Sequence, residues 1–281
     1  MDSIIIEDGY NTSYLTSLLV LLFYNNNKYL NNILTSCPIV ASYCYLQELI
    51  TDFINKIYKG FMINVDTINE IKNFIYITNY DNIDIFDYIE TDNMIHIYEL
   101  IINNIVNEQI IITCQSIVNN SHIYDLNNCD EKKIINYIDI ELNENSNIKT
   151  ELNKWFDNFI KTETIQQNEF MLYKFEILPH IIGIHINRIY NTYKFDITKC
   201  IKFEGITDSI QKHIKWRIHG FLLKNNNKYY TLFYLNNNWI KYEEGQILSF
   251  NTTDLNDINN INKYMSDVVF ILYILDDDTR L

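Results

Sequence analysis

The amino-acid sequence predicts an α+β chain, in which a helical N-terminal part is followed by a mainly antiparallel β part. Before residue 107, apolar residues recur at the three- and four-residue spacing of helices that bury one face. From residue 108 onward, they gather in short runs rich in Ile, Tyr and Phe, which are typical of strands. Only 6 Gly and 2 Pro are present among 281 residues. We therefore expect one domain, 1–281, without a flexible linker.

The helical part divides into segments that are separated by helix-breaking residues. Pro38 and Gly60 interrupt the pattern, because proline lacks an amide hydrogen and glycine loses much backbone entropy in a helix. One more helix is signalled inside the β part, where Ser146 and Asn147 precede spaced apolar residues. The predicted helices cover 14–24, 44–58, 66–78, 94–106 and 147–160.

The β part begins with separated apolar runs and continues, after Pro179, as a dense series of strands. Asparagine triplets lie between several of the apolar runs, and asparagine is a good turn residue because its side chain bonds to nearby backbone. The predicted strands cover 110–113, 134–140, 170–175, 181–189, 214–223, 229–235, 239–242 and 268–275.

The stretch 8–18, Asp-Gly-Tyr-Asn-Thr-Ser-Tyr-Leu-Thr-Ser-Leu, says most about function. A short turn ends at Ser13, and the apolar residues that follow recur at helical spacing. Residue 13 is thus expected at a helix N-terminus, where the macrodipole would lower the pKa of a thiol. A serine hydroxyl gains little there, because it needs a neighbouring base. A structural alternative is that Ser13 is only the N-cap.

This stretch resembles the cysteine box of ubiquitin-specific proteases, N-x-G-N-T-C-Y-L-N-S-x-L, with serine in place of the nucleophilic cysteine. Other segments resemble further signatures of that family in the same order along the chain. The most specific is 178–189, which is similar to L-P-x-x-L-I-I-H-L-K-R-F. The remaining segments are 84–89, 137–142 with the helix around Trp155 and then Glu163, 216–223, 229–244, and 267–275.

The resemblance implies a papain-like fold with a thumb, fingers and a palm. The helical part, 1–107, would form the thumb, and 108–281 would form the fingers and palm. Ser13 would begin the first long helix and face a hairpin made by 229–235 and 239–243. The cleft would hold the extended, basic C-terminal tail of ubiquitin. Its binding residues would be Trp239 and Tyr242 on the hairpin, and Asp84 and Asp87 on the thumb.

The resemblance also implies that the catalytic positions have lost their chemistry. Ser13 takes the place of the nucleophile, and the histidine position falls at Lys228 or Tyr229, with Lys228 preferred. A solvated lysine is protonated near neutral pH and cannot accept the proton of the nucleophile. Glu243 takes the place of the orienting aspartate. Asp8 replaces the oxyanion-stabilising asparagine, so a carboxylate would face a developing negative charge.

Other residues that could carry chemistry are expected to be structural. His185 lies inside an apolar strand, and the resemblance places it in the core. The zinc site of the family needs two C-x-x-C pairs, whereas Cys114 and Cys129 are isolated and cannot complete a tetrahedral site. We therefore predict no metal and no cofactor, with fingers that are short and lack zinc.

Composition favours a protein partner over nucleic acid or membrane. A net charge of −14 argues against sequence-independent binding to nucleic acid. The sequence shows neither a signal peptide nor an apolar segment that could span a bilayer. The five cysteines lack paired spacing, so free thiols in the reducing cytoplasm are expected. The richness in Ile, Tyr and Asn indicates an AT-rich genome, for instance that of a large DNA virus, which would place the protein in the host cytoplasm or the virion.

Three functions fit these observations. The first, which we expect, is a pseudo-deubiquitinase that binds ubiquitin or another protein without cleaving it, because thiol, imidazole and oxyanion amide are lost together. The second is an active hydrolase in which Lys228 serves Ser13 as base, which requires a buried lysine with a strongly lowered pKa. The third is a structural or assembly protein that retains only the fold. Serine at position 13, taken alone, would also fit an engineered replacement of cysteine.

Overall fold

A computed structural model describes most of the chain. The described residues are 6–7, 12–24, 27–36, 40–78, 94–106, 110–120, 123–142, 148–156, 168–175, 177–188, 200–201, 215–226, 228–235, 238–249 and 264–276. The chain divides into two compact units. One unit comprises Met1–Asn107 and His219–Ile271, and the other comprises Glu108–Ile218 and Leu272–Leu281.

The helices of the first unit follow the predicted series closely. They are α1 (Ser13–Phe23), α2 (Lys28–Ile33), α3 (Cys44–Tyr58), α4 (Val65–Thr78) and α5 (Met94–Ile101), which continues as a π-helical turn over Ile102–Val106. Helix α2 was not predicted. It begins after Asn27, whose side chain accepts hydrogen bonds from the backbone N–H groups of Tyr29 and Leu30. An asparagine in a turn triplet is therefore also a helix N-cap.

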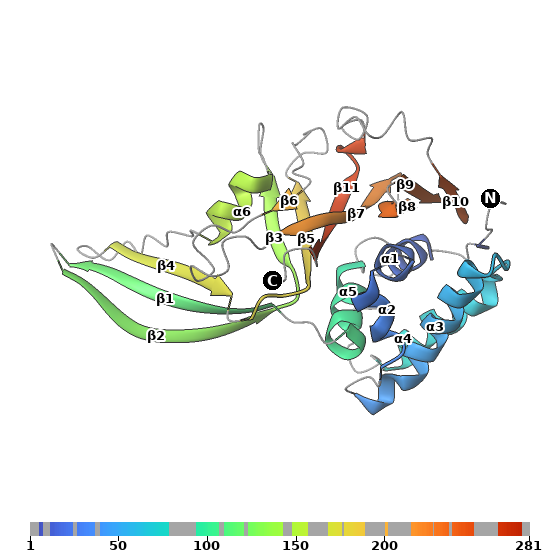
Figure 1. The fold of residues 1–281 in the computed structure, drawn as a ribbon, viewed down its shortest axis with the longest axis horizontal. Helices are drawn as coiled ribbons and strands as arrows, with labels where there is room; N and C mark the ends of the chain where they lie inside the picture. The colour runs from blue at the N-terminus through green and yellow to red at the C-terminus, as the bar shows by residue number, and fades with distance from the viewer. Residues whose placement is uncertain are drawn as a thin grey trace. The chain divides into compact units, whose positions relative to one another are not determined.

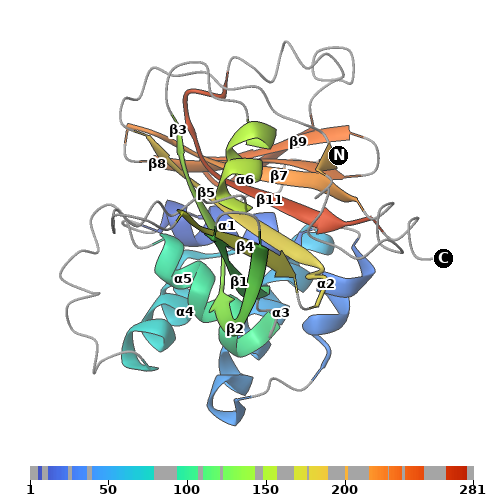
Figure 2. The same cartoon turned by 90° about the vertical axis from the view of Figure 1, so that its left-hand side faces the viewer.

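Helix α1 is the centre of this unit, because it is buried on every side. All its residues from Leu15 to Phe23 are buried, including Thr16 and Ser17. Figure 2 shows β8 (Lys228–Leu235) and β9 (Asn238–Glu243) on one side of α1, and α3, α4 and α5 on the other. A helix that is apolar all round belongs in a core. The N-terminus of α1 is thereby held in a fixed place against the sheet.

The main sheet has the strand order β10-β9-β8-β7-β11-β5-β3, with β6 added beside β7 (Figure 1). Pairs β6–β7, β7–β8, β8–β9 and β9–β10 are antiparallel, whereas β3 and β5 are parallel. The prediction of a largely antiparallel sheet is thus confirmed. The remaining strands are β3 (Ile138–Leu142), β5 (Ile181–Arg188), β6 (Cys200–Ile201), β7 (Trp216–Asn225), β10 (Gln246–Ser249) and β11 (Val268–Leu275).

The second unit also contains a separate antiparallel sheet of three strands in the order β2-β1-β4. Its strands are β1 (Ile110–Asn120), β2 (Ile123–Ile135) and β4 (Asn168–Phe175), and α6 (Ile148–Phe156) is the predicted fifth helix. The run 134–140, predicted as one strand, is divided: β2 ends at 135 and β3 starts at 138 in the other sheet. None of the described helices is long and apolar enough to cross a membrane.

Candidate functional site

Ser13 is the first residue of α1 and is half-buried. The N-cap is Thr12, whose carbonyl oxygen accepts hydrogen bonds from the N–H groups of Leu15 and Thr16, while its side chain makes no capping bond. The alternative that Ser13 is merely an N-cap is therefore wrong. Its side chain is left for other contacts at the start of the helix.

The hydroxyl of Ser13 lies against strand β8. The backbone N–H of Tyr229 donates a hydrogen bond to Ser13 Oγ at 3.2 Å. Tyr229 is 8% exposed, and its ring contacts the Tyr14 ring edge-on, with centroids 6.4 Å apart. Burial raises the pKa of the Tyr14 phenol. A tyrosine hydroxyl ordinarily has a pKa of about 10 and is no base at neutral pH. The residue that touches Ser13 is thus a tyrosine, not the lysine preferred from the sequence.

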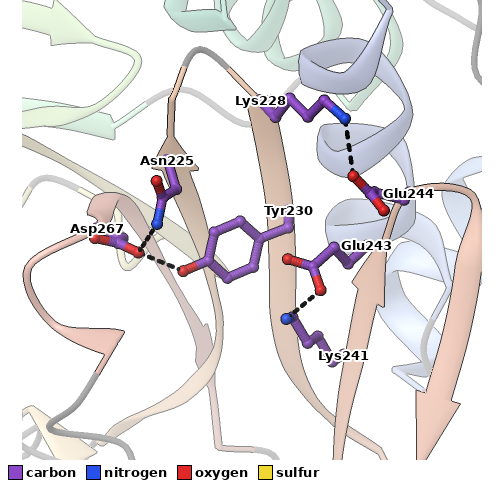
Figure 3. A network of polar contacts seen from close by, with 7 residues as sticks. All are labelled: Asn225, Lys228, Tyr230, Lys241, Glu243, Glu244 and Asp267. Carbon is purple, nitrogen blue, oxygen red and sulfur yellow. Dashed lines mark hydrogen bonds and ion pairs between the residues drawn. The ribbon is translucent and has the colours of Figure 1, made fainter.

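Lys228 is directed to a different group. Its Nζ lies 2.8 Å from Oε1 of Glu244, and the two side chains are 70% and 68% exposed (Figure 3). The hydrogen bond from Lys228 and its positive charge lower the pKa of Glu244. A Ser–Lys dyad needs a buried lysine that is free to lose its proton. Lys228 is instead exposed and paired with a carboxylate, which favours its protonated form.

Glu243 does not join Ser13 either. In the β8–β9 hairpin, Thr231 is the register partner of Tyr242. Thr231 Oγ1 donates to the Ser17 carbonyl of α1, so the face of the hairpin that bears Thr231 and Tyr242 is turned toward this helix. Side chains alternate along a strand, and Glu243 therefore points to the opposite face, where it pairs with Lys241.

The two hairpin residues predicted to bind a partner are core residues. Trp239 is 7% exposed and stacks on Phe221, with centroids 5.6 Å apart. Tyr242 is 1% exposed. The other predicted positions, Asp8, Asp84 and Asp87, lie outside the described residues.

The chain just before the site is anchored by a glycine turn that sequence reasoning missed. The N–H of Ile6 donates to the Gly245 carbonyl at 2.6 Å, and the N–H of Glu7 donates to the Ile63 carbonyl at 2.8 Å. Gly245 has φ +77°, and a Cβ there would overlap the carbonyl oxygen of Ile6. Only glycine fits this position. The sequence does contain a signal for a turn here, because the polar run Glu243-Glu244-Gly245 separates two apolar segments.

Two buried polar groups attach α1 to the sheet. Nε2 of His219 lies 2.9 Å from the Leu21 carbonyl oxygen, and Thr231 Oγ1 lies 3.1 Å from the Ser17 carbonyl oxygen. Burial lowers the pKa of His219 to about 4, so the imidazole is neutral and Nε2 carries the donated proton. Gly220 allows the close approach, since a Cβ there would lie 2.7 Å from Leu21 Cδ1. His219 is therefore a structural residue.

A polar network on β7, β8 and β9 was also not predicted (Figure 3). The Tyr230 hydroxyl donates to Asp267 at 2.7 Å, and Asn225 Nδ2 donates to the same carboxylate oxygen at 3.1 Å. Burial and the bond to Asp267 raise the pKa of Tyr230. Lys241 lies over the Tyr230 ring, with Nζ 4.9 Å from its centroid. Alternation of side chains puts this network on the sheet face opposite to α1.

Among the residues that the structure describes, no group of three or more His, Cys, Asp or Glu side chains could hold a metal ion. Cys114 lies in β1 and Cys129 in β2, but their side chains are outside the described set. His185 is half-buried rather than fully enclosed, and its Nδ1 lies 2.9 Å from Oδ1 of Asp139 on the parallel neighbour β3.

The sequence matches no protein-family model and no curated protein. Solved structures do match. Ubp8 in the SAGA DUB module bound to ubiquitin aldehyde has a TM-score of 0.66 at 12% identity, over 98% of this chain and 70% of that one. A cysteine-to-alanine variant of Ubp8 in the module bound to monoubiquitin has a TM-score of 0.65 at 11% identity, over 98% and 69%.

A third match comes from a different protein. The pseudoubiquitin hydrolase–RNA exonuclease module of Saccharomyces cerevisiae Pan2, in complex with AAGGA RNA, has a TM-score of 0.65 at 11% identity, over 100% of this chain and 55% of that one. At such identities a likeness establishes the fold alone. The chain therefore has the α+β fold of ubiquitin-specific protease modules, with Ser13 at the start of its central helix and Tyr229 against it.

Proposed function

We propose that this protein is a catalytically degenerate relative of the ubiquitin-specific proteases, which binds ubiquitin or another protein without hydrolysing it. The observation that carries the proposal is the bond from the Tyr229 backbone N–H to Ser13 Oγ. This bond supports the proposal, because it brings Tyr229, a residue that is 8% exposed, next to the hydroxyl that an imidazole would have to activate in a serine hydrolase.

Hydrolysis at Ser13 requires a base that can take the hydroxyl proton within hydrogen-bond reach. Lys228 is ion-paired with Glu244 in solvent. His219 is the histidine that contacts α1, but it is buried, and its Nε2 is occupied by the Leu21 carbonyl. Glu243 points to the other face of the hairpin, where it pairs with Lys241. The polar groups of this region thus bond to one another and leave no described base for Ser13.

Binding is proposed because the same fold occurs in proteins that are described with ubiquitin. The Ubp8 modules were solved with monoubiquitin or ubiquitin aldehyde, and the Pan2 module is described as a pseudoubiquitin hydrolase. A fold can keep a binding surface after its chemistry has gone, since function resides in a site rather than in a fold. The acidic chain, with a net charge of −14, would suit the basic tail of ubiquitin.

The test uses the full chain and three measurements. We expect no release of fluorophore from a fluorogenic ubiquitin substrate, no covalent product with ubiquitin that carries an electrophilic C-terminus, and saturable binding of ubiquitin in calorimetry. Turnover that is abolished by Ser13→Ala would overturn the proposal of inactivity. Absence of ubiquitin binding would leave the inactive site in place and redirect the search to another protein partner.

Variants of the site separate the two candidate histidine positions. Ser13→Cys alone is expected to give no turnover, because no base makes or uses the thiolate. Adding Tyr229→His places an imidazole at the residue that contacts Ser13, and we expect this pair to react with the electrophilic ubiquitin. The matched control adds Lys228→His instead, on an exposed side chain that turns to Glu244. Equal reaction of the two pairs would contradict the assignment of Tyr229.

A further inference from the structure

An exposed cluster of aromatic and acidic side chains lies where α3 and α4 pack together. We call it the aromatic–acidic cluster. Its members come from the 3-10 turn Ala41–Tyr43, the first turns of α3, and the middle and later turns of α4: Tyr43, Tyr45, Glu48, Glu70 and Phe74. Spacings of three and four residues put Tyr45 beside Glu48 and Glu70 beside Phe74, so each helix contributes an aromatic ring and a carboxylate to one face. Over the ranges that the structure describes, no hydrogen bond or ring contact joins these five side chains to Ser13.

The Phe74 ring holds the aromatic part of the cluster together. Its centroid lies 5.7 Å from that of Tyr45, with the planes inclined by 58°, and 6.3 Å from that of Tyr43, with an angle of 71°. Tyr45 is 47% exposed, and Ile77, one turn beyond Phe74, is 70% exposed. Exposed large apolar side chains that gather in one place are typical of interaction sites.

Two carboxylates, those of Glu48 and Glu70, give the cluster a negative charge. The Tyr45 hydroxyl donates a hydrogen bond to Glu70 Oε1. This bond, together with the negative charges of Glu70 and Glu48, raises the pKa of Tyr45. Both glutamates are exposed, and within the described part of the chain no lysine or arginine forms an ion pair with either of them. Aromatic faces and uncompensated carboxylates therefore occupy the same surface.

We propose that the aromatic–acidic cluster binds a lysine or arginine side chain presented by an extended basic segment of a partner protein. A cation is attracted both by the quadrupole of an aromatic face and by a carboxylate. The aliphatic stem of the same side chain can lie on the exposed carbons of Ile77 and Tyr45. An anionic partner would be repelled by Glu48 and Glu70, and a purely apolar one would desolvate the two carboxylates without neutralising their charge.

The inference is independent of the proposed function, since its residues lie on α3 and α4 and not at Ser13. It is tested on the full chain with a fluorescein-labelled octalysine, its octa-arginine counterpart, and a neutral Gly-Ser peptide of equal length. Fluorescence anisotropy gives the affinity at low and physiological salt. NMR of the aromatic rings locates the contact.

The diagnostic variant is Glu48→Gln/Glu70→Gln, which removes both charges and keeps the size of the side chains. We expect it to weaken binding of the basic peptides about tenfold, as two exposed charge contacts would allow. The matched control is the double variant Glu141→Gln/Glu151→Gln, with side chains on β3 and α6 of the other unit. This control removes the same charge as the cluster variant and should change binding less than twofold.

The outcomes decide the proposal. Weaker binding of the cluster variant than of the charge-matched control, together with shifts of the Tyr45 and Phe74 ring resonances on peptide addition, supports it. Equal weakening in both would show attraction to the net charge of the chain alone and would overturn it. The proposal would also be overturned if neither octalysine nor octa-arginine bound more tightly than the Gly-Ser peptide. An unchanged urea midpoint of the cluster variant shows that the comparison is made on folded protein.

Discussion

Acidification should loosen the attachment of α1 to the sheet through one residue, His219. Its imidazole is buried, and Nε2 bonds to the Leu21 carbonyl oxygen at 2.9 Å. Burial lowers the pKa of this group from the ordinary 6.5 to about 4. Between these pH values His219 is protonated in the unfolded chain and neutral in the folded chain. Stability therefore rises with pH in this window and is lost as the pH falls from 6.5 toward 4.

The magnitude follows from the two pKa values. The full difference corresponds to about 3 kcal/mol, reached near pH 4, where the unfolded imidazole is fully protonated. About 2 kcal/mol of this would be lost between pH 7 and pH 5. Carboxylates elsewhere also titrate in acid, so His219 must be isolated by a variant. His219→Gln is the matched change, because the amide nitrogen of glutamine can donate to the Leu21 carbonyl and carries no titratable proton.

The assay is urea unfolding followed by far-UV circular dichroism at pH 7, 6 and 5, for the parent chain and for His219→Gln. We expect the free energy of unfolding of the parent to fall by about 2 kcal/mol more than that of the variant between pH 7 and pH 5. An NMR titration of the parent imidazole gives a second reading that needs no variant. Parallel pH dependence of the two proteins, or an imidazole that titrates near its ordinary pKa, would refute the reasoning.

The other predictions concern close contacts and buried bonds. Gly220→Ala should lower the free energy of unfolding by about 1–3 kcal/mol, because the new Cβ would lie 2.6 Å from the Leu232 carbonyl oxygen, and an unchanged urea midpoint would contradict this. Gly245→Ala should lower the free energy of unfolding more than Gly60→Ala does. Both glycines have positive φ, but only at Gly245 would the new Cβ overlap the Ile6 carbonyl oxygen, and equal urea midpoints of the two variants would contradict this overlap. Tyr230→Phe should cost about 1–3 kcal/mol, as it removes a bond to Asp267, which thermal unfolding can measure.

Much of the fold could be predicted from the sequence because its signals are local and repeated. Helices α3 and α4 and strands β5 and β11 follow their predicted bounds within a residue or two, since apolar periodicity over eight or more residues reports which face is buried. The same signal misled at 134–140. There the apolar residues continue while the backbone leaves one sheet and enters another, which composition does not reveal.

The site was harder to predict, because it depends on register. From the sequence the histidine position falls at Lys228 or Tyr229 with Lys228 preferred, and a shift of register by one residue exchanges the two faces of a strand. In the structure the backbone N–H of Tyr229 donates to Ser13 Oγ, and the register of β8 and β9 fixes the face on which Glu243 lies. Similarly, the role of Trp239 as a buried ring under Phe221 follows from packing between strands that spacing cannot show.

The bonds around α1 join this helix to the sheet and require no catalytic role of Ser13. Ser13 Oγ accepts the Tyr229 N–H, Thr231 donates to the Ser17 carbonyl, and His219 donates to the Leu21 carbonyl, so three polar contacts join one helix to the sheet along its length. A serine hydroxyl becomes a nucleophile when a neighbouring base takes its proton, and the Tyr229 N–H is a donor that cannot do so. At Ser13 the hydroxyl instead contributes to the contact between helix and sheet. Selection for this contact alone would retain the position, the helix and the hairpin, and would place no demand on an imidazole at Tyr229.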